Sequence, residues 1–97
     1  MSDPSDGGLP SGATDPMQFP MDFPVKIMGL AVDGFADEIV ALVLAHAPDY
    51  DPATTEMRAS KTGKYVSLTT TIRATSRTQL DALYRALTAH PMVKVAL

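Results

Sequence analysis

The side chains best suited to metal binding or acid–base chemistry are the two histidines, His46 and His90. Each is expected at the C-terminal end of a helix, where an imidazolium interacts favourably with the helix dipole and can cap carbonyls. The two lie far apart in the sequence, the chain has no cysteine, and neither histidine has a second ligand at metal-site spacing. The pattern favours helix capping, so we expect no metal site and no cofactor.

Acidic and hydroxyl side chains give no catalytic arrangement either. Asp33, Asp37 and Glu38 cluster at an expected helix start, where dipole complementarity alone favours acids. Serines and threonines are plentiful, but no histidine is placed to activate one. Gly29 and Gly34 have the wrong number and spacing for a phosphate-binding loop. We expect no catalytic residues and no enzymatic activity.

One alternating stretch, residues 65–74, predicts the strand around which the other elements are arranged. A period of two with β-branched residues indicates a strand covered on one face and open on the other. The predicted inner residues are Val66, Leu68, Thr70, Ile72 and Ala74. The predicted outer residues are Tyr65, Ser67, Thr69, Thr71 and Arg73.

The remaining pattern predicts three more strands and two helices. A first strand spans 23–29, and a helix capped by Asp33 runs to Pro48, which stops it. An edge strand spans 54–60, with Thr55, Met57 and Ala59 on its inner face. A second helix follows a capping box made by Ser76 and Gln79. A last strand spans 92–97, with Val93, Val95 and Leu97 inward and Met92, Lys94 and Ala96 outward.

The element order β-α-β-β-α-β predicts an α+β, ferredoxin-like sandwich. Its four-stranded antiparallel sheet should have the order 4-1-3-2, with both helices on one face. The other face of the sheet is then open to solvent or to a partner.

Composition indicates one domain, at 18–97, behind a tail at 1–17. The tail is acidic and rich in Gly and Pro, and it carries Asp3, Asp6 and Asp15 without a base; we expect it to be disordered. The net charge is −3, and beyond the tail eight acids balance the eight bases. No membrane helix or signal peptide is evident, so a cytoplasmic location is expected.

Several short motifs resemble the YbeD-like family of small bacterial proteins. The match begins with Phe19-Pro20, Phe23, Lys26 and Met28-Gly29, and continues through His46-Ala47-Pro48, Tyr50 and Pro52. It also includes Gly63, Tyr65, Ser67, Thr71-Ile72, Ala74-Thr75, Leu83-Tyr84, Leu87, Val93-Lys94 and Leu97. The resemblance covers residues 18–97. It implies a ferredoxin-like fold similar to the regulatory ACT domains, and it brings no established catalytic residues.

The connection from Gly29 to Gly34 is similar to the effector-binding corner of ACT domains. There, backbone N–H groups at a helix N-terminus can hold the carboxylate of a small metabolite. Gly29, Asp33 and Gly34 are therefore candidate ligand-binding residues. The alternative is an ordinary loop in which the glycines only permit the turn.

The open sheet face is the second candidate site, because it mixes apolar side chains with basic ones. Its predicted partner-binding residues are Lys26, Met28, Tyr65, Thr69, Thr71, Arg73 and Lys94. We expect a regulatory or protein-interaction module that binds a protein partner or itself through this face. The alternative is single-stranded nucleic-acid binding, which usually uses several stacked aromatics, and Tyr65 is the only aromatic here.

Overall fold

The computed structural model describes residues 18–97. The predicted tail at 1–17 lies outside the described residues. In chain order the elements are strand β1 (Met21–Leu30), helix α1 (Phe35–His46), the 3-10 turn η3 (Pro52–Thr54), strands β2 (Glu56–Ala59) and β3 (Tyr65–Ala74), helix α2 (Arg77–Ala89) and strand β4 (Val93–Ala96). The predicted order of helices and strands is confirmed.

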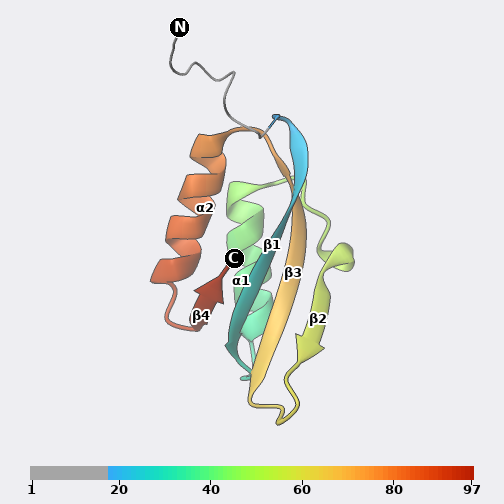
Figure 1. Ribbon diagram of the computed structural model, residues 1–97, viewed down its shortest axis with the longest axis vertical. Helices are drawn as coiled ribbons and strands as arrows, with labels where there is room; N and C mark the ends of the chain where they lie inside the picture. Colours follow the sequence, from blue (N-terminus) through green and yellow to red (C-terminus); the bar gives the residue numbers. More distant parts are fainter. Residues whose placement is uncertain (1–17) are drawn as a thin grey trace, which may run out of the picture.

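The four strands form one antiparallel sheet with the order β2-β3-β1-β4. This is the predicted order, 4-1-3-2, counted from the other edge. The central strands β1 and β3 pair along their whole length, from Met21 opposite Ala74 to Leu30 opposite Tyr65. Figure 1 shows α1 and α2 next to each other on one side of this sheet. In the described part of the chain, nothing covers the other side.

The core lies between the sheet and the two helices. All five predicted inner residues of β3 are buried, and they pack with β1 and with the apolar stripes of both helices. The buried hydroxyl of Thr70 donates a hydrogen bond to the carbonyl of Val25 at 3.3 Å, so its polar group is satisfied. The alternation therefore identified the covered face of β3 correctly.

Helix α1 does not begin as predicted. Its N-cap is Gly34, with φ 85°, and no side chain caps the helix; Asp33 lies one residue too early, exposed in the turn. A residue entering the helix at positive φ favours glycine, which has no Cβ to clash. The prediction of Asp33 as N-cap was wrong.

Helix α2 begins with half of the predicted capping box. The hydroxyl of Ser76 accepts from the N–H of Gln79 at 3.0 Å, but the side-chain oxygen of Gln79 accepts from the N–H of Thr75 at 2.6 Å. The amide nitrogen of Gln79 donates instead to the carbonyl of His46 at 2.9 Å. Gln79 thus ties the start of α2 to the end of α1.

Strand β4 contains an irregularity that changes which side chains face outward. Val93 pairs with Gly29 and Val95 pairs with Met28, with a register shift between the two pairs. Because the shift inserts one residue, Val95 turns to the open face and is 43% exposed, while Ala96 turns inward. The prediction that Val95 and Leu97 point inward, and Ala96 outward, was wrong.

The predicted inner face of β2 is also less covered than expected. Met57 is 65% exposed, Ala59 is exposed, and only Thr55, just before the strand, is partly buried. The strand has four residues and lies at the sheet edge, and α1 does not pack closely on it: residues of α1 line a hollow of about 450 Å³ together with Thr55 and Met57.

Pro24 lies within β1 rather than at its start. Lys26 exchanges two backbone hydrogen bonds with Leu97, at 3.1 and 2.8 Å, so the backbone of Lys26 points toward β4. Because the direction alternates along a strand, Pro24 also points to that side, where no described residue pairs with it. A proline is tolerated there because no ladder partner needs its missing N–H.

Candidate interaction surface on the open face of the sheet

The open face is the side of the sheet that carries no helix, and its side chains lie in rows across the strands. One row contains Arg58 of β2, Ser67 of β3, Met28 of β1 and Val95 of β4, which are opposite one another in register. The next row contains Glu56, Thr69, Lys26 and Leu97. The β2 side of both rows is charged, and the β4 side is apolar.

The apolar part of the open face is larger than the sequence indicated. Met28 is 38% exposed, Tyr65 36%, Val95 43% and Leu97 69%. Residues 18–97 contain two further exposed large apolar side chains, Val32 and Met57. Most of the exposed apolar side chains of the described chain therefore gather on this one face, which is typical of an interaction surface.

Sequence reasoning missed Val95 and Leu97 because the irregularity in β4 reverses their direction. Simple alternation, continued from Val93, places both in the core. A bulge in a short edge strand leaves no distinct residue pattern, so the signal was absent from this sequence.

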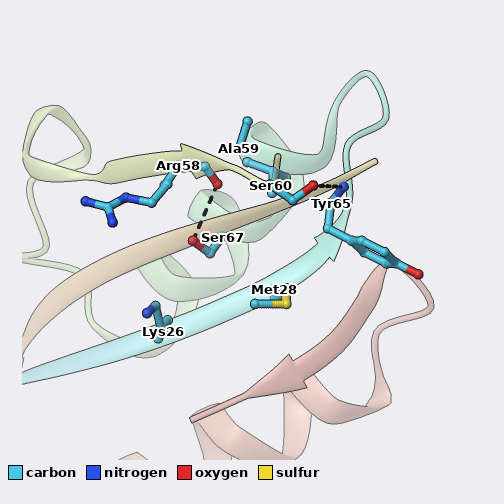
Figure 2. A pocket seen from close by; sticks show the side chains of 8 residues that line it. Lys26, Met28, Arg58, Ala59, Ser60, Tyr65 and Ser67 are labelled. Carbon is cyan, nitrogen blue, oxygen red and sulfur yellow. Dashed lines mark hydrogen bonds between the residues drawn. The ribbon is translucent and has the colours of Figure 1, made fainter. Parts of the chain in front are cut away.

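Two hollows that share lining residues lie on the open face, where β1, β2 and β3 run side by side. Figure 2 shows the first of them. One has a volume of about 290 Å³ and is lined by Lys26, Met28, Arg58, Ala59, Ser60, Tyr65, Val66 and Ser67. The other, about 270 Å³, is lined by Lys26, Glu56, Met57, Arg58, Ser67 and Thr69. Lys26, Arg58 and Ser67 line both hollows, so two bases flank their common floor.

The bases of this face differ in their partners. Arg73 forms an ion pair with Asp22 at 3.3 Å, and the ammonium of Lys64 lies 5.6 Å from the centre of the Tyr65 ring. Lys26 and Arg58, by contrast, form no ion pair with any residue between 18 and 97. A partner could therefore engage both cations without breaking an existing ion pair, and the same holds for Lys94, away from the hollows.

The other predicted residues of this face are spread along it. Thr69 is partly buried in the row of Lys26, while Thr71 is exposed opposite Pro24, farther from the hollows. Lys94 is exposed and lies at the irregularity of β4. Lys26, Met28 and Tyr65 meet at the larger hollow, but Thr71, Arg73 and Lys94 do not line either one.

The other candidate site, the connection from Gly29 to Gly34, is lined by acids instead of bases. Gly29 is buried, and a Cβ on it would come within 2.3 Å of the carbonyl oxygen of Met92 and 2.5 Å of the Phe35 ring. Gly29 is therefore needed for close packing in the core, because no larger residue fits between the Met92 carbonyl and the Phe35 ring. Asp33 and Gly34 line a separate hollow of about 290 Å³ together with Asp37, and no base lines it. Ligand binding at this corner stays a prediction, and these carboxylates would repel an anion.

The two histidines have structural partners. Nδ1 of His46 lies 3.0 Å from the carbonyl oxygen of Leu42, one turn back in α1, so the ring contacts its own helix. Nδ1 of His90 accepts from the N–H of Met92 at 3.1 Å, which leaves Nε2 to donate to Glu38 at 3.3 Å. His90 therefore joins the end of α2 to the first turn of α1 instead of capping carbonyls.

Few features of the described chain suggest chemistry. Among residues 18–97 no three His, Asp or Glu side chains are grouped so as to hold a metal ion. Burial raises the pKa of the Tyr84 hydroxyl, but α2 lies on the covered side of the sheet. No helix within the same range is long and apolar enough to cross a membrane.

Comparison with known sequences places the chain in a family. Residues 14–97 match the profile of the family described as "Protein of unknown function (DUF493)". The chain belongs to this family. It is 53% identical over 81 residues to a UPF0250 protein of Nitrosomonas europaea, covering 84% of this chain and 93% of that one. It is 57% identical to a UPF0250 protein of Ralstonia nicotianae, covering 84% of each.

Solved structures confirm the fold. The solution structure of protein HP0495 from H. pylori superimposes with a TM-score of 0.66 at 14% identity, covering 94% of this chain and 97% of that one. The crystal structure of the ACT domain from the GTP pyrophosphokinase of Chlorobium tepidum gives 0.54 at 17% identity, covering 79% and 97%. The ferredoxin-like, ACT-like architecture expected from the sequence is correct.

Proposed function

We propose that this protein is a non-catalytic, cytoplasmic module that binds another protein through the open face of its sheet. The observation that carries the proposal is the gathering of exposed apolar side chains, including Val95 and Leu97, beside two unpaired bases. Interfaces combine an apolar centre with a polar rim, and this face has both.

Charge complementarity determines the kind of partner. Lys26 and Arg58 favour a surface that presents carboxylates, and Met28, Val95 and Leu97 favour apolar groups beside them. Face-to-face pairing of two copies is less suitable, because Lys26 and Arg58 outnumber the neighbouring Glu56, so each copy would bring an excess of positive charge into one interface. The occupant is therefore a different protein with an acidic and apolar surface.

Two alternatives have less support. For nucleic acid, Tyr65 is the single aromatic available for stacking, and Lys64 already lies over its ring. For a small carboxylate metabolite held by Gly29, Asp33 and Gly34, the hollow at that corner is lined by acids and no base. Both observations leave binding of another protein as the better supported proposal.

Site-specific photo-crosslinking tests the proposal. The full chain would carry a benzophenone amino acid at Val95 in its native cell, with Arg85, exposed on α2, as the matched control position. We expect an adduct with a different protein from position 95 only, at a mapped site next to aspartate or glutamate. Equal adducts from both positions, an adduct with a second copy of the chain, or an adduct with RNA would each contradict it.

A further inference from the structure

The two hollows of the open face share a floor that is suited to an anion. Ser67 lies between Arg58 of β2 and Lys26 of β1, and all three line both hollows. Figure 2 shows Arg58, Ser67 and Lys26 on three adjacent strands, with Met28 next to them on the β1 side. A charged area and an apolar area therefore meet at one place.

Sheet geometry puts the two bases within reach of one bound group. Arg58 is opposite Ser67, and Lys26 is opposite Thr69. Arg58 and Lys26 are therefore separated by two strand spacings across the sheet and by two residues along the strands. With strands about 4.8 Å apart and a rise of about 3.4 Å per residue, their Cα atoms are about 12 Å apart. Both side chains are long, and each can bend toward an acceptor above Ser67.

We propose that this floor binds the carboxylate of an aspartate or glutamate in an extended, apolar segment of the partner protein. Arg58 and Lys26 donate charge-assisted hydrogen bonds to the carboxylate. The hydroxyl of Ser67 now donates to the backbone carbonyl of Arg58 at 3.5 Å, and by rotating away from that carbonyl it becomes a third donor. The neighbouring apolar side chain of the segment packs on Met28 and Val95. This inference rests on the proposed function and names the group that the partner supplies.

Glu56 restricts what can bind. Its carboxylate lines the smaller hollow beside both bases, although it forms no ion pair with either of them in the described part of the chain. Two bases and one acid give the floor a net charge of +1, so a single carboxylate neutralises it and a second anion is repelled. The site therefore takes one carboxylate at a time, which favours a protein side chain over the closely spaced phosphates of a nucleic acid.

The test uses three fluorescent hexapeptides that alternate leucine with glutamate, glutamine or lysine, titrated against the full chain by anisotropy. We expect the glutamate peptide to bind at least about tenfold more tightly than the glutamine peptide, and the lysine peptide not to bind. Lys26→Met and Arg58→Gln should each weaken the glutamate peptide about fivefold, as loss of one exposed charge pair does. Glu56→Gln should tighten it, and the control Arg85→Gln should leave it unchanged.

Other ligands and variants provide the contradicting outcomes. Equal affinity for the glutamate and glutamine peptides, or no effect of Arg58→Gln, would overturn the carboxylate site. N-acetylleucine binding as tightly as the peptide would show a metabolite site instead, and tighter binding of a hexauridylate would show a nucleic-acid site. Crosslinking from Val95 that survives Lys26→Met with Arg58→Gln would refute this inference and leave the proposed function standing. Peptide binding without crosslinking from Val95 would refute the proposed function.

Discussion

Leu68 and Thr69 are neighbours on β3 but belong to opposite faces of the sheet, and the two faces hold their side chains in different ways. Leu68 is fully buried under the helices, so its shape and volume are fixed by packing. Thr69 is only partly buried on the open face, where the fold tolerates many side chains. The covered face therefore explains why the chain folds, and the open face is available for binding.

The largest effect is expected on the covered face. Leu68→Ala should lower the free energy of unfolding by about 2–5 kcal/mol, because it removes buried apolar atoms and leaves a cavity. Thr69→Ala is the matched control and should stay within about 0.5 kcal/mol. Urea denaturation of both variants measures the difference. Similar losses for the two would show that the faces are assigned incorrectly.

A second large effect is expected where β1, α1 and β4 meet. Gly29→Ala should cost about 1–3 kcal/mol, because the new Cβ would collide with the Met92 carbonyl and the Phe35 ring. The adjacent Met28→Ala, on the open face, should cost less in the same thermal or urea melts. A Gly29→Ala variant as stable as the wild type would show that the Met92 carbonyl and the Phe35 ring can move away from Gly29 at little cost.

Smaller effects on stability are expected at the N-terminal ends of the two helices, and they should differ between α2 and α1. Ser76→Ala should cost about 1 kcal/mol, since the hydroxyl accepts from the N–H of Gln79. Asp33→Ala should change stability little, because Asp33 does not cap α1. Equal losses of unfolding free energy for the two variants in denaturation experiments would show that Asp33 does cap α1.

The smallest effect is expected on the open face itself. Arg73→Gln removes an ion pair with Asp22 whose side chains are 50% and 74% exposed, so the loss should be no more than about 1 kcal/mol and should fade at high salt. Denaturation at two ionic strengths measures it. A large, salt-independent loss would show that Arg73 has a structural role beyond this pair.

The sequence was sufficient for the fold because its strongest signals are local. Ten alternating residues identified β3, and helical periodicity with Ser76 and Pro48 defined the helices. Three of the assignments that failed did so for physical reasons that alternation does not contain. A register shift turned Val95 outward, a short edge position left Met57 exposed, and a positive φ at Gly34 moved the start of α1.

The candidate site could be predicted only in part for the same reasons. Lys26, Met28 and Tyr65 were named from alternation and meet at one hollow. Arg58 was not among the predicted residues of this face, and only the register with Ser67 shows that it shares that hollow with Lys26. Val95 and Leu97 joined the surface through the irregularity in β4. Which charges remain unpaired depends on side-chain geometry, which the sequence does not encode locally.

Pro24 has a consequence for the solubility of the protein. Between Met21 and Val25, the β4-facing side of β1 has no neighbouring strand in the described chain, and a bare strand edge is a template for aggregation. An added strand would lack a donor at Pro24 and would meet its ring instead. The proline thus protects one edge of the sheet against uncontrolled growth, so that strand-to-strand association is discouraged while side-chain binding on the open face remains possible.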